Sequence, residues 1–148
     1  MLVYEDIPRY DWWLKFALGV PLLVLLGAGI VLWFEDREAS LIMFGVTVFD
    51  TILFRAILPR RFQIFEDRVK IVLGSPFAVS LSLGNIKEAR QVLGSHALAS
   101  SNIRFATSTH NVVEIVRKKG TSVLISPTHV DTFLELVNQA IAATSKSR

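Results

Sequence analysis

Two long apolar runs near the start of the chain limit what it can fold into. Residues 16–34 contain no charged side chain, and residues 39–58 contain only Asp50 and Arg55. A helix of about 19 residues is roughly 28 Å long, close to the hydrocarbon thickness of a bilayer, which is about 30 Å. The sequence therefore predicts two transmembrane helices, over residues 16–34 and 39–58.

Only residues 35–38 separate the two runs, so the helices are expected to form an antiparallel hairpin. A cleaved signal peptide is the first alternative, but its apolar region is usually about 7–15 residues and ends in small residues. Here the run is longer and ends in Trp33-Phe34-Glu35-Asp36. Helices in the core of a soluble domain are the second alternative, and unbroken apolarity over about five turns argues against it.

Lys and Arg near the helix ends predict the orientation of the hairpin. Basic residues flank its two outer ends, whereas the loop 35–38 has Arg37 among three acids. We therefore expect a multi-pass protein of the cytoplasmic membrane with both termini in the cytoplasm. In this interpretation, residues 1–15 are a cytoplasmic juxtamembrane segment, 35–38 an external loop and 59–148 a cytoplasmic domain. The flanking basic residues are Arg9, Lys15, Arg60, Arg61, Arg68 and Lys70.

Charge divides the chain at the same place. Residues 1–58 contain 4 Lys and Arg against 7 Asp and Glu, whereas residues 59–148 contain 12 against 6. A basic domain beside a bilayer suggests contact with anionic lipid headgroups or with an acidic protein. No RNA- or DNA-binding motif accompanies the basic charge, so a nucleic-acid partner is not expected. The chain has no cysteine, which excludes disulfides, thiolate nucleophiles and cysteine-bound metals.

The periodicity changes to two after Pro59, which predicts half-buried strands. Short turns join these strands, and short turns favour antiparallel pairing. A helix follows, for which Ser126 is the expected N-cap and Pro127 the first helical residue. The expected strands lie at 61–64, 68–73, 77–83, 86–92, 103–106, 112–117 and 121–125, and the apolar stripe of the helix is Val130, Phe133, Leu134, Val137 and Ile141.

About seven strands followed by one helix predict an α+β soluble domain. The specific expectation is a pleckstrin-homology-like (PH-like) plan, in which a bent antiparallel barrel is capped by a C-terminal helix.

Three stretches carry a resemblance to a known family. They are LPRRFQIFEDRVKI at 58–71, PFAVSLSLGNIKEARQV at 76–92 and NVVEIVRKKGTSVLISP at 111–127. With the hairpin, they resemble the bacterial PH-domain membrane proteins that have an N-terminal two-helix transmembrane hairpin. The resemblance implies a membrane location and a binding or scaffolding domain. The first strand hairpin departs from phosphoinositide-binding PH domains, because its turn, Glu66-Asp67, is acidic.

No catalytic or metal-binding pattern is recognisable. His96, His110 and His129 have no partner at a metal-ligand spacing, and nucleotide-binding and nucleophile-elbow motifs are absent from the sequence. We therefore expect no enzymatic activity, no cofactor and no metal.

Two basic clusters are the candidate binding residues. Arg117, Lys118 and Lys119 form the densest cluster, at an expected turn, where they would contact anionic lipid or an acidic protein, or would simply be solvated. Arg60 and Arg61 follow the second apolar run and are expected to anchor its end to headgroups.

Two polar residues lie inside the second apolar run. Asp50 is near mid-bilayer, where a carboxylate costs roughly 2.5–3.5 kcal/mol on insertion scales. It is either an ion or proton site, or a protonated acid bonded to Thr47, Thr51 or another copy of the chain. Arg55 is near the cytoplasmic end and can extend to the headgroups.

The leading hypothesis is a non-enzymatic, membrane-tethered interaction or scaffolding module that binds an unknown protein partner or assembles with its own copies. One alternative is a small subunit of a transport or channel assembly that uses Asp50. The other is an anionic-lipid sensor that uses Arg117, Lys118 and Lys119.

Overall fold

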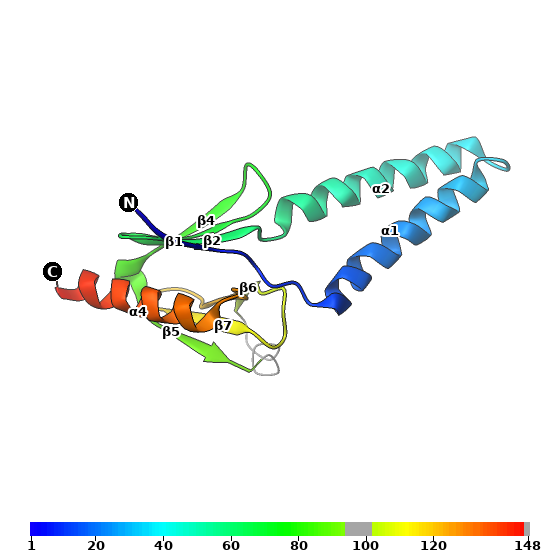
Figure 1. Ribbon diagram of the computed structural model, residues 1–148. Coiled ribbons are helices and arrows are strands. Elements are labelled where there is room, and N and C mark those ends of the chain that lie inside the picture. Colours follow the sequence, from blue (N-terminus) through cyan, green and yellow to red (C-terminus); the bar gives the residue numbers. More distant parts are fainter. Residues whose placement is uncertain (94–101, 147–148) are drawn as a thin grey trace. The chain divides into compact units, whose positions relative to one another are not determined.

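The computed structural model describes residues 1–93 and 102–146, so the candidate His96 lies outside the described residues. The chain divides into two compact units. One is a helical unit, Trp12–Ile57, and the other is a domain made of Met1–Asp11 together with Leu58–Arg148. Figure 1 shows the elements of both units.

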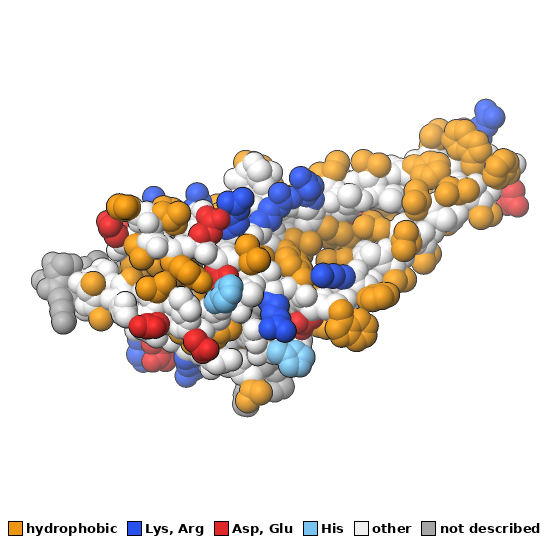
Figure 2. Space-filling view, viewed as in Figure 1, with side chains coloured by type: hydrophobic (Ala, Val, Ile, Leu, Met, Phe, Trp, Pro, Cys, Tyr) orange, Lys and Arg blue, Asp and Glu red, His pale blue; other side chains and the backbone are white. Residues whose placement is uncertain are grey.

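The helical unit consists of α1, Trp12–Leu32, and α2, Arg37–Ile57. Both helices are long and apolar enough to cross a membrane, and only 6% of each apolar window is buried. Figure 2 shows hydrophobic side chains over the surface of both helices. The two predicted apolar helices are therefore present, and they are not core helices. Each begins a few residues before its predicted start.

Close contact between α1 and α2 is centred on Gly29. The Ser40 hydroxyl donates a 2.6 Å hydrogen bond to the Gly29 carbonyl, and both residues are buried. The Phe44 ring lies only 3.0 Å from the position that a Cβ on residue 29 would take. The Asp36 carboxylate accepts hydrogen bonds from the Glu38 and Ala39 amides, which caps the start of α2.

The first sheet of the domain is an antiparallel meander in the order β1-β2-β3-β4. Alternate residues of the central strands, such as Phe62 and Ile64, are fully buried, so one face of the sheet lines the core. Its strands are β1, Leu2–Asp6; β2, Arg61–Phe65; β3, Arg68–Val72; and β4, Ala78–Ser82.

Strand β1 lies within the segment 1–15, for which the sequence predicts no strand. Leu2, Val3 and Glu5 are exposed, so the pattern of burial in β1 is weak. Its partner, β2, follows only after both helices, and Tyr4 pairs with Ile64. The helical unit is therefore an insertion between two neighbouring strands of one sheet.

The second sheet has the order β5-β7-β8-β6. The prediction of exclusively antiparallel pairing is wrong here, because β6 pairs with β8 in parallel. Strands β7 and β8 form an antiparallel hairpin, and β6 lies along the other edge of β8. The strands are β5, Ile86–Val92; β6, Ile103–Phe105; β7, Val112–Arg117; and β8, Val123–Ile125, with a short 3-10 turn, η1, at Leu83–Asn85.

Helix α4, Val130–Lys146, covers the core with its apolar stripe. Phe133 and Val137 are fully buried, and the Phe133 ring meets Phe62 edge to face at 6.4 Å. The predicted cap is wrong, because Ser126 and Pro127 precede the helix in extended chain and Pro127 forms a bridge with Pro8.

The helix entry is instead held by Asp6, whose carboxylate accepts a 2.9 Å bond from the His129 amide. A carboxylate beside the first turn is also stabilised by the positive end of the helix dipole.

The predicted α+β class is confirmed. The described residues form two sheets of four strands and a C-terminal helix, but no closed barrel.

Candidate functional site

A basic groove of about 300 Å³ lies on the domain, on the face of the first sheet that points away from the core. Because Phe62 and Ile71 point into the core, their neighbours Arg61 and Lys70 point to the opposite face. The groove combines these two cations and Arg60 with the loop that connects β3 and β4, including Ser75, Pro76 and Phe77. In Figure 2, Lys and Arg side chains gather beside this loop, in the upper middle of the view.

Two main-chain hydrogen bonds hold the loop of the basic groove in shape. The Phe77 amide donates to the Gly74 carbonyl at 2.9 Å, and the Leu73 amide donates to the Phe77 carbonyl at 3.0 Å. The Phe77 side chain is nevertheless 55% exposed. An aromatic ring therefore stands in solvent next to three cations.

The three cations differ in their partners. Arg61 forms a 2.9 Å ion pair with Glu5 on β1, and Gln63 binds the other oxygen of the same carboxylate. Neither Arg60 nor Lys70 forms an ion pair with any residue in 1–93 or 102–146. The basic groove thus keeps a net positive charge that the described part of the domain does not neutralise.

Tyr10 fixes the main chain where the groove begins. Its hydroxyl donates a hydrogen bond to the carbonyl of Pro59, directly before Arg60. Burial raises the pKa of Tyr10, and the nearby Arg60 cation offsets part of that rise.

The second predicted basic cluster is largely engaged in structure. Arg117 ends β7, and the Lys118 ammonium donates to the Gly84 carbonyl at 3.2 Å. The Asn85 side chain binds both the amide and the carbonyl of Lys119. Gly120 has a φ of +91°, which a glycine adopts without strain. This turn therefore docks on η1, where Lys118 lines a small hollow of about 20 Å³ together with residues of η1 and α4.

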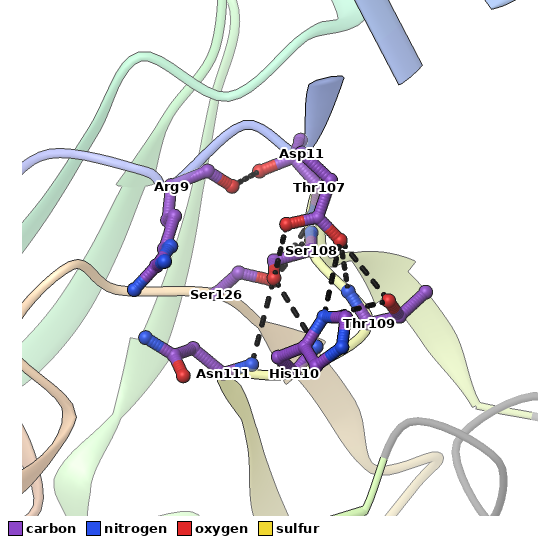
Figure 3. A network of polar contacts seen from close by, with 8 residues as sticks. All are labelled: Arg9, Asp11, Thr107, Ser108, Thr109, His110, Asn111 and Ser126. Carbon is purple, nitrogen blue, oxygen red and sulfur yellow. Dashed lines mark hydrogen bonds and ion pairs between the residues drawn. The ribbon is translucent and has the colours of Figure 1, made fainter. Parts of the chain in front are cut away.

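A polar network joins the N-terminal segment to two distant loops of the domain (Figure 3). The Asp11 carboxylate accepts bonds from the Ser108 hydroxyl at 2.8 Å and from the Thr109 amide and hydroxyl at 2.8 and 3.0 Å. The Ser126 hydroxyl accepts bonds from the amides of Thr107 and Ser108. These contacts tie the residues before α1 to the loops that precede β7 and α4.

The network contains Ser108, His110 and Asp11, the residue types of a catalytic triad, but not its geometry. The Ser108 hydroxyl donates to Asp11 and accepts from the His110 and Asn111 amides. The His110 ring contacts Thr109 and lies 3.8 Å from Asp11, and within the described residues it makes no bond to the Ser108 hydroxyl. In a catalytic triad the histidine ring accepts the proton of the nucleophile's hydroxyl, whereas here the Asp11 carboxylate accepts it, so the arrangement is not that of a triad.

Asp6 and His129 form a second carboxylate–histidine contact, at 3.2 Å. The Asp6 side chain is only 2% exposed, and its two oxygens also accept the amides of Ile7 and His129. No group of three His, Cys, Asp or Glu residues suited to a metal ion occurs among residues 1–93 and 102–146.

The two polar candidates of the second apolar run, Asp50 and Arg55, both lie on α2. Asp50 is partly exposed on α2, and Arg55 is exposed one turn and a half further on. The Thr47 hydroxyl donates to the Met43 carbonyl and the Thr51 hydroxyl to the Thr47 carbonyl. Both hydroxyls thus donate within α2, and among the described residues neither forms a hydrogen bond with Asp50.

Sequence reasoning found Arg60 and Arg61 but missed the rest of the groove and the whole Asp11 network. Lys70 was identified only as a flanking charge, and Phe77 only as a strand residue. The polar run Ser108–Asn111 was a usable signal, because so many short polar side chains together suit a hydrogen-bonded turn.

Comparison with known protein families, with curated proteins and with solved structures gives no match for this chain. The resemblance to bacterial PH-domain membrane proteins therefore stays a prediction, and function must be argued from the chain's own residues.

Proposed function

We propose that the chain is a non-enzymatic, membrane-tethered interaction module that holds its domain at the cytoplasmic surface of the membrane. In this proposal α1 and α2 cross the bilayer as a hairpin. The domain binds its partners, protein or lipid, from that fixed position.

The insertion of the helices between β1 and β2 is the observation that supports this function best. The connections are residues 7–11 on one side and residues 58–60 on the other. Three residues reach at most about 11 Å, so the domain cannot move far from the end of α2. Two short connections to the helices suit a domain that binds its partners at the membrane surface and not one that diffuses through the cytosol.

The orientation proposal rests on charge. The connections and the strands next to them carry Arg9, Arg60 and Arg61, whereas the tip between α1 and α2 carries a single cation, Arg37, among acids. Basic segments next to membrane helices favour the cytoplasmic side. Both ends of the hairpin join the same domain, so both termini share that side.

The PH-like plan belongs to the same proposal. The eight strands that residues 1–93 and 102–146 form in two sheets, followed by one C-terminal helix, support it. PH-like domains are interaction modules in the family that the sequence resembles, which supports a binding role.

Single cysteines test the topology on a clean background, because the natural chain has none. Glu35→Cys places a thiol at the tip between the helices, and Ser145→Cys places one on exposed α4. In intact cells, an impermeant maleimide is expected to label Glu35→Cys and not Ser145→Cys. After permeabilisation it should label both. The chain should also stay in the membrane fraction at alkaline pH. Labelling of Ser145→Cys in intact cells, or release into the soluble fraction, would contradict the proposal.

A further inference from the structure

The basic groove has the composition of a phosphate site. Arg60, Arg61 and Lys70 contribute three cations, and no acidic residue is among the side chains that line the groove. Glu5 neutralises Arg61 from the neighbouring strand, which leaves Arg60 and Lys70 as the cations available to a ligand. Guanidinium and ammonium groups are the usual partners of phosphate oxygens.

The loop beside these cations adds an apolar element. Pro76 and Phe77 are exposed at its tip, and the main-chain bonds at Leu73 and Gly74 hold the ring outward. A soluble phosphate ligand has no use for an exposed aromatic ring. A lipid does, because the ring enters the boundary between headgroups and acyl chains while the cations hold the phosphate.

The position of the groove in the chain decides between lipid and free phosphate, and this step rests on the proposed function. Arg60 lies three residues after Ile57, the last residue of α2. If α2 crosses the membrane, these residues keep Arg60 within about 11 Å of its end, in the headgroup zone. Such a tether raises the effective concentration of lipid phosphates over that of soluble ones.

We propose that the basic groove binds the phosphate of an anionic glycerophospholipid, with Arg60 and Lys70 as phosphate contacts and Phe77 inserted at the acyl boundary.

Lipid titration of the full-length chain in a nonionic detergent tests this proposal. Phosphatidylglycerol, phosphatidylcholine and soluble glycerol 1-phosphate are added separately, and bound molecules are counted by native mass spectrometry. We expect phosphatidylglycerol to bind in preference to the other two. In R60Q/K70Q its affinity should fall roughly 10- to 30-fold, since each basic residue near an anionic surface contributes about a factor of five.

The matched control is K87Q/K119Q, which removes the same charge from exposed positions elsewhere on the domain. It should bind phosphatidylglycerol as the natural chain does. Because Lys119 belongs to the second basic cluster, this control also tests the alternative lipid site. Phe77→Ser keeps all the charges. It should weaken the binding of phosphatidylglycerol and leave any binding of glycerol 1-phosphate unchanged.

Four results would overturn the proposal. They are no preference for phosphatidylglycerol, equal loss in the two double variants, unchanged binding in R60Q/K70Q, and competition by glycerol 1-phosphate at the concentration of the lipid. Thermal unfolding of each variant shows whether a loss reflects the groove or the fold. A chain that labels as expected in the topology experiment but has no lipid preference refutes the groove alone, and the proposed function stands.

Discussion

At the scale of single residues, Asp11 holds more of the domain together than its place before α1 suggests. Its carboxylate accepts three hydrogen bonds from Ser108 and Thr109 and is only 12% exposed. Its own amide donates to the Thr107 carbonyl at 3.1 Å. The carboxylate thus supplies acceptors for the Ser108 and Thr109 donors, which lie in a loop and not in a strand ladder.

Asp11→Ala is expected to destabilise the loop 107–110 by roughly 1–3 kcal/mol, because the Thr109 amide loses its acceptor in a partly buried place. Hydrogen exchange of the full-length chain measures this as faster exchange at Thr109. Glu66→Ala is the matched control. It removes a carboxylate that pairs with the N-terminal amine at the surface and should change stability by less than about 0.5 kcal/mol. Unchanged protection at Thr109 in Asp11→Ala would show that the network is incidental.

At the scale of elements, the contact between α1 and α2 depends on a missing side chain. A Cβ at Gly29 would lie 3.0 to 3.3 Å from three atoms of the Phe44 ring, whereas a Cβ at Gly27 would meet nothing within 4 Å. The Ser40 hydrogen bond to the Gly29 carbonyl needs the same close approach. Small residues at such crossings are a common means of packing membrane helices.

The two glycines therefore make a matched pair of variants. Gly27→Ala should be neutral or slightly stabilising, because alanine favours a helix by up to about 1 kcal/mol. Gly29→Ala should be less stable than Gly27→Ala by roughly 1–3 kcal/mol, the usual cost of overpacking. Thermal unfolding in detergent measures the difference, and Phe44→Leu should recover part of the loss in the Gly29→Ala chain. Equal stability of the two variants would mean that α1 and α2 do not pack through Gly29.

Elements that depend on local pattern were predictable, and those that depend on distant partners were not. The predicted strands 86–92 and 112–117 have the bounds of β5 and β7, and the period of two located β3, which is predicted at 68–73 and observed at Arg68–Val72, because alternate burial is visible in the local sequence. Strand β1 was missed, since its ladder forms with β2 beyond the helices. The parallel pairing of β6 was missed for the same reason.

The candidate sites divide in the same way. Arg60 and Arg61 were predictable because an apolar run ends just before them. The Asp11 network was not, because its partners are 97 and 98 residues away in sequence. Likewise, the prediction of Ser126 as the N-cap was wrong because its hydroxyl accepts hydrogen bonds from the distant amides of Thr107 and Ser108.

At the scale of the whole molecule, the domain is discontinuous. Residues 1–11 supply an edge strand, the Asp6 carboxylate at the start of α4 and the Asp11 network, and Tyr4 packs against the core. The domain is therefore expected to fold only when both parts of the chain are present, although the 46 residues between them, Trp12–Ile57, form a separate unit.

Removing the helical unit tests this directly. One chain joins residues 1–11 to residues 58–148 through about six Gly and Ser residues, whose root-mean-square length is about 13 Å. This length suffices to join residue 11 to residue 58, because the hydrogen bond from the Tyr10 hydroxyl to the Pro59 carbonyl shows that the two ends lie close together. We expect this chain to be water-soluble and cooperatively folded, with slow exchange at the amides of β2.

The comparison chain, residues 58–148 alone, lacks β1 and leaves the edge of β2 and the His129 amide without their partners. It should therefore unfold at a lower temperature or aggregate through its exposed edge. Circular dichroism and hydrogen exchange compare the two. Equal stability would mean that β1 is dispensable and that residues 7–11 merely lead to α1. The predicted difference instead makes the first eleven residues part of the domain, so that the helical unit is anchored to it at both ends.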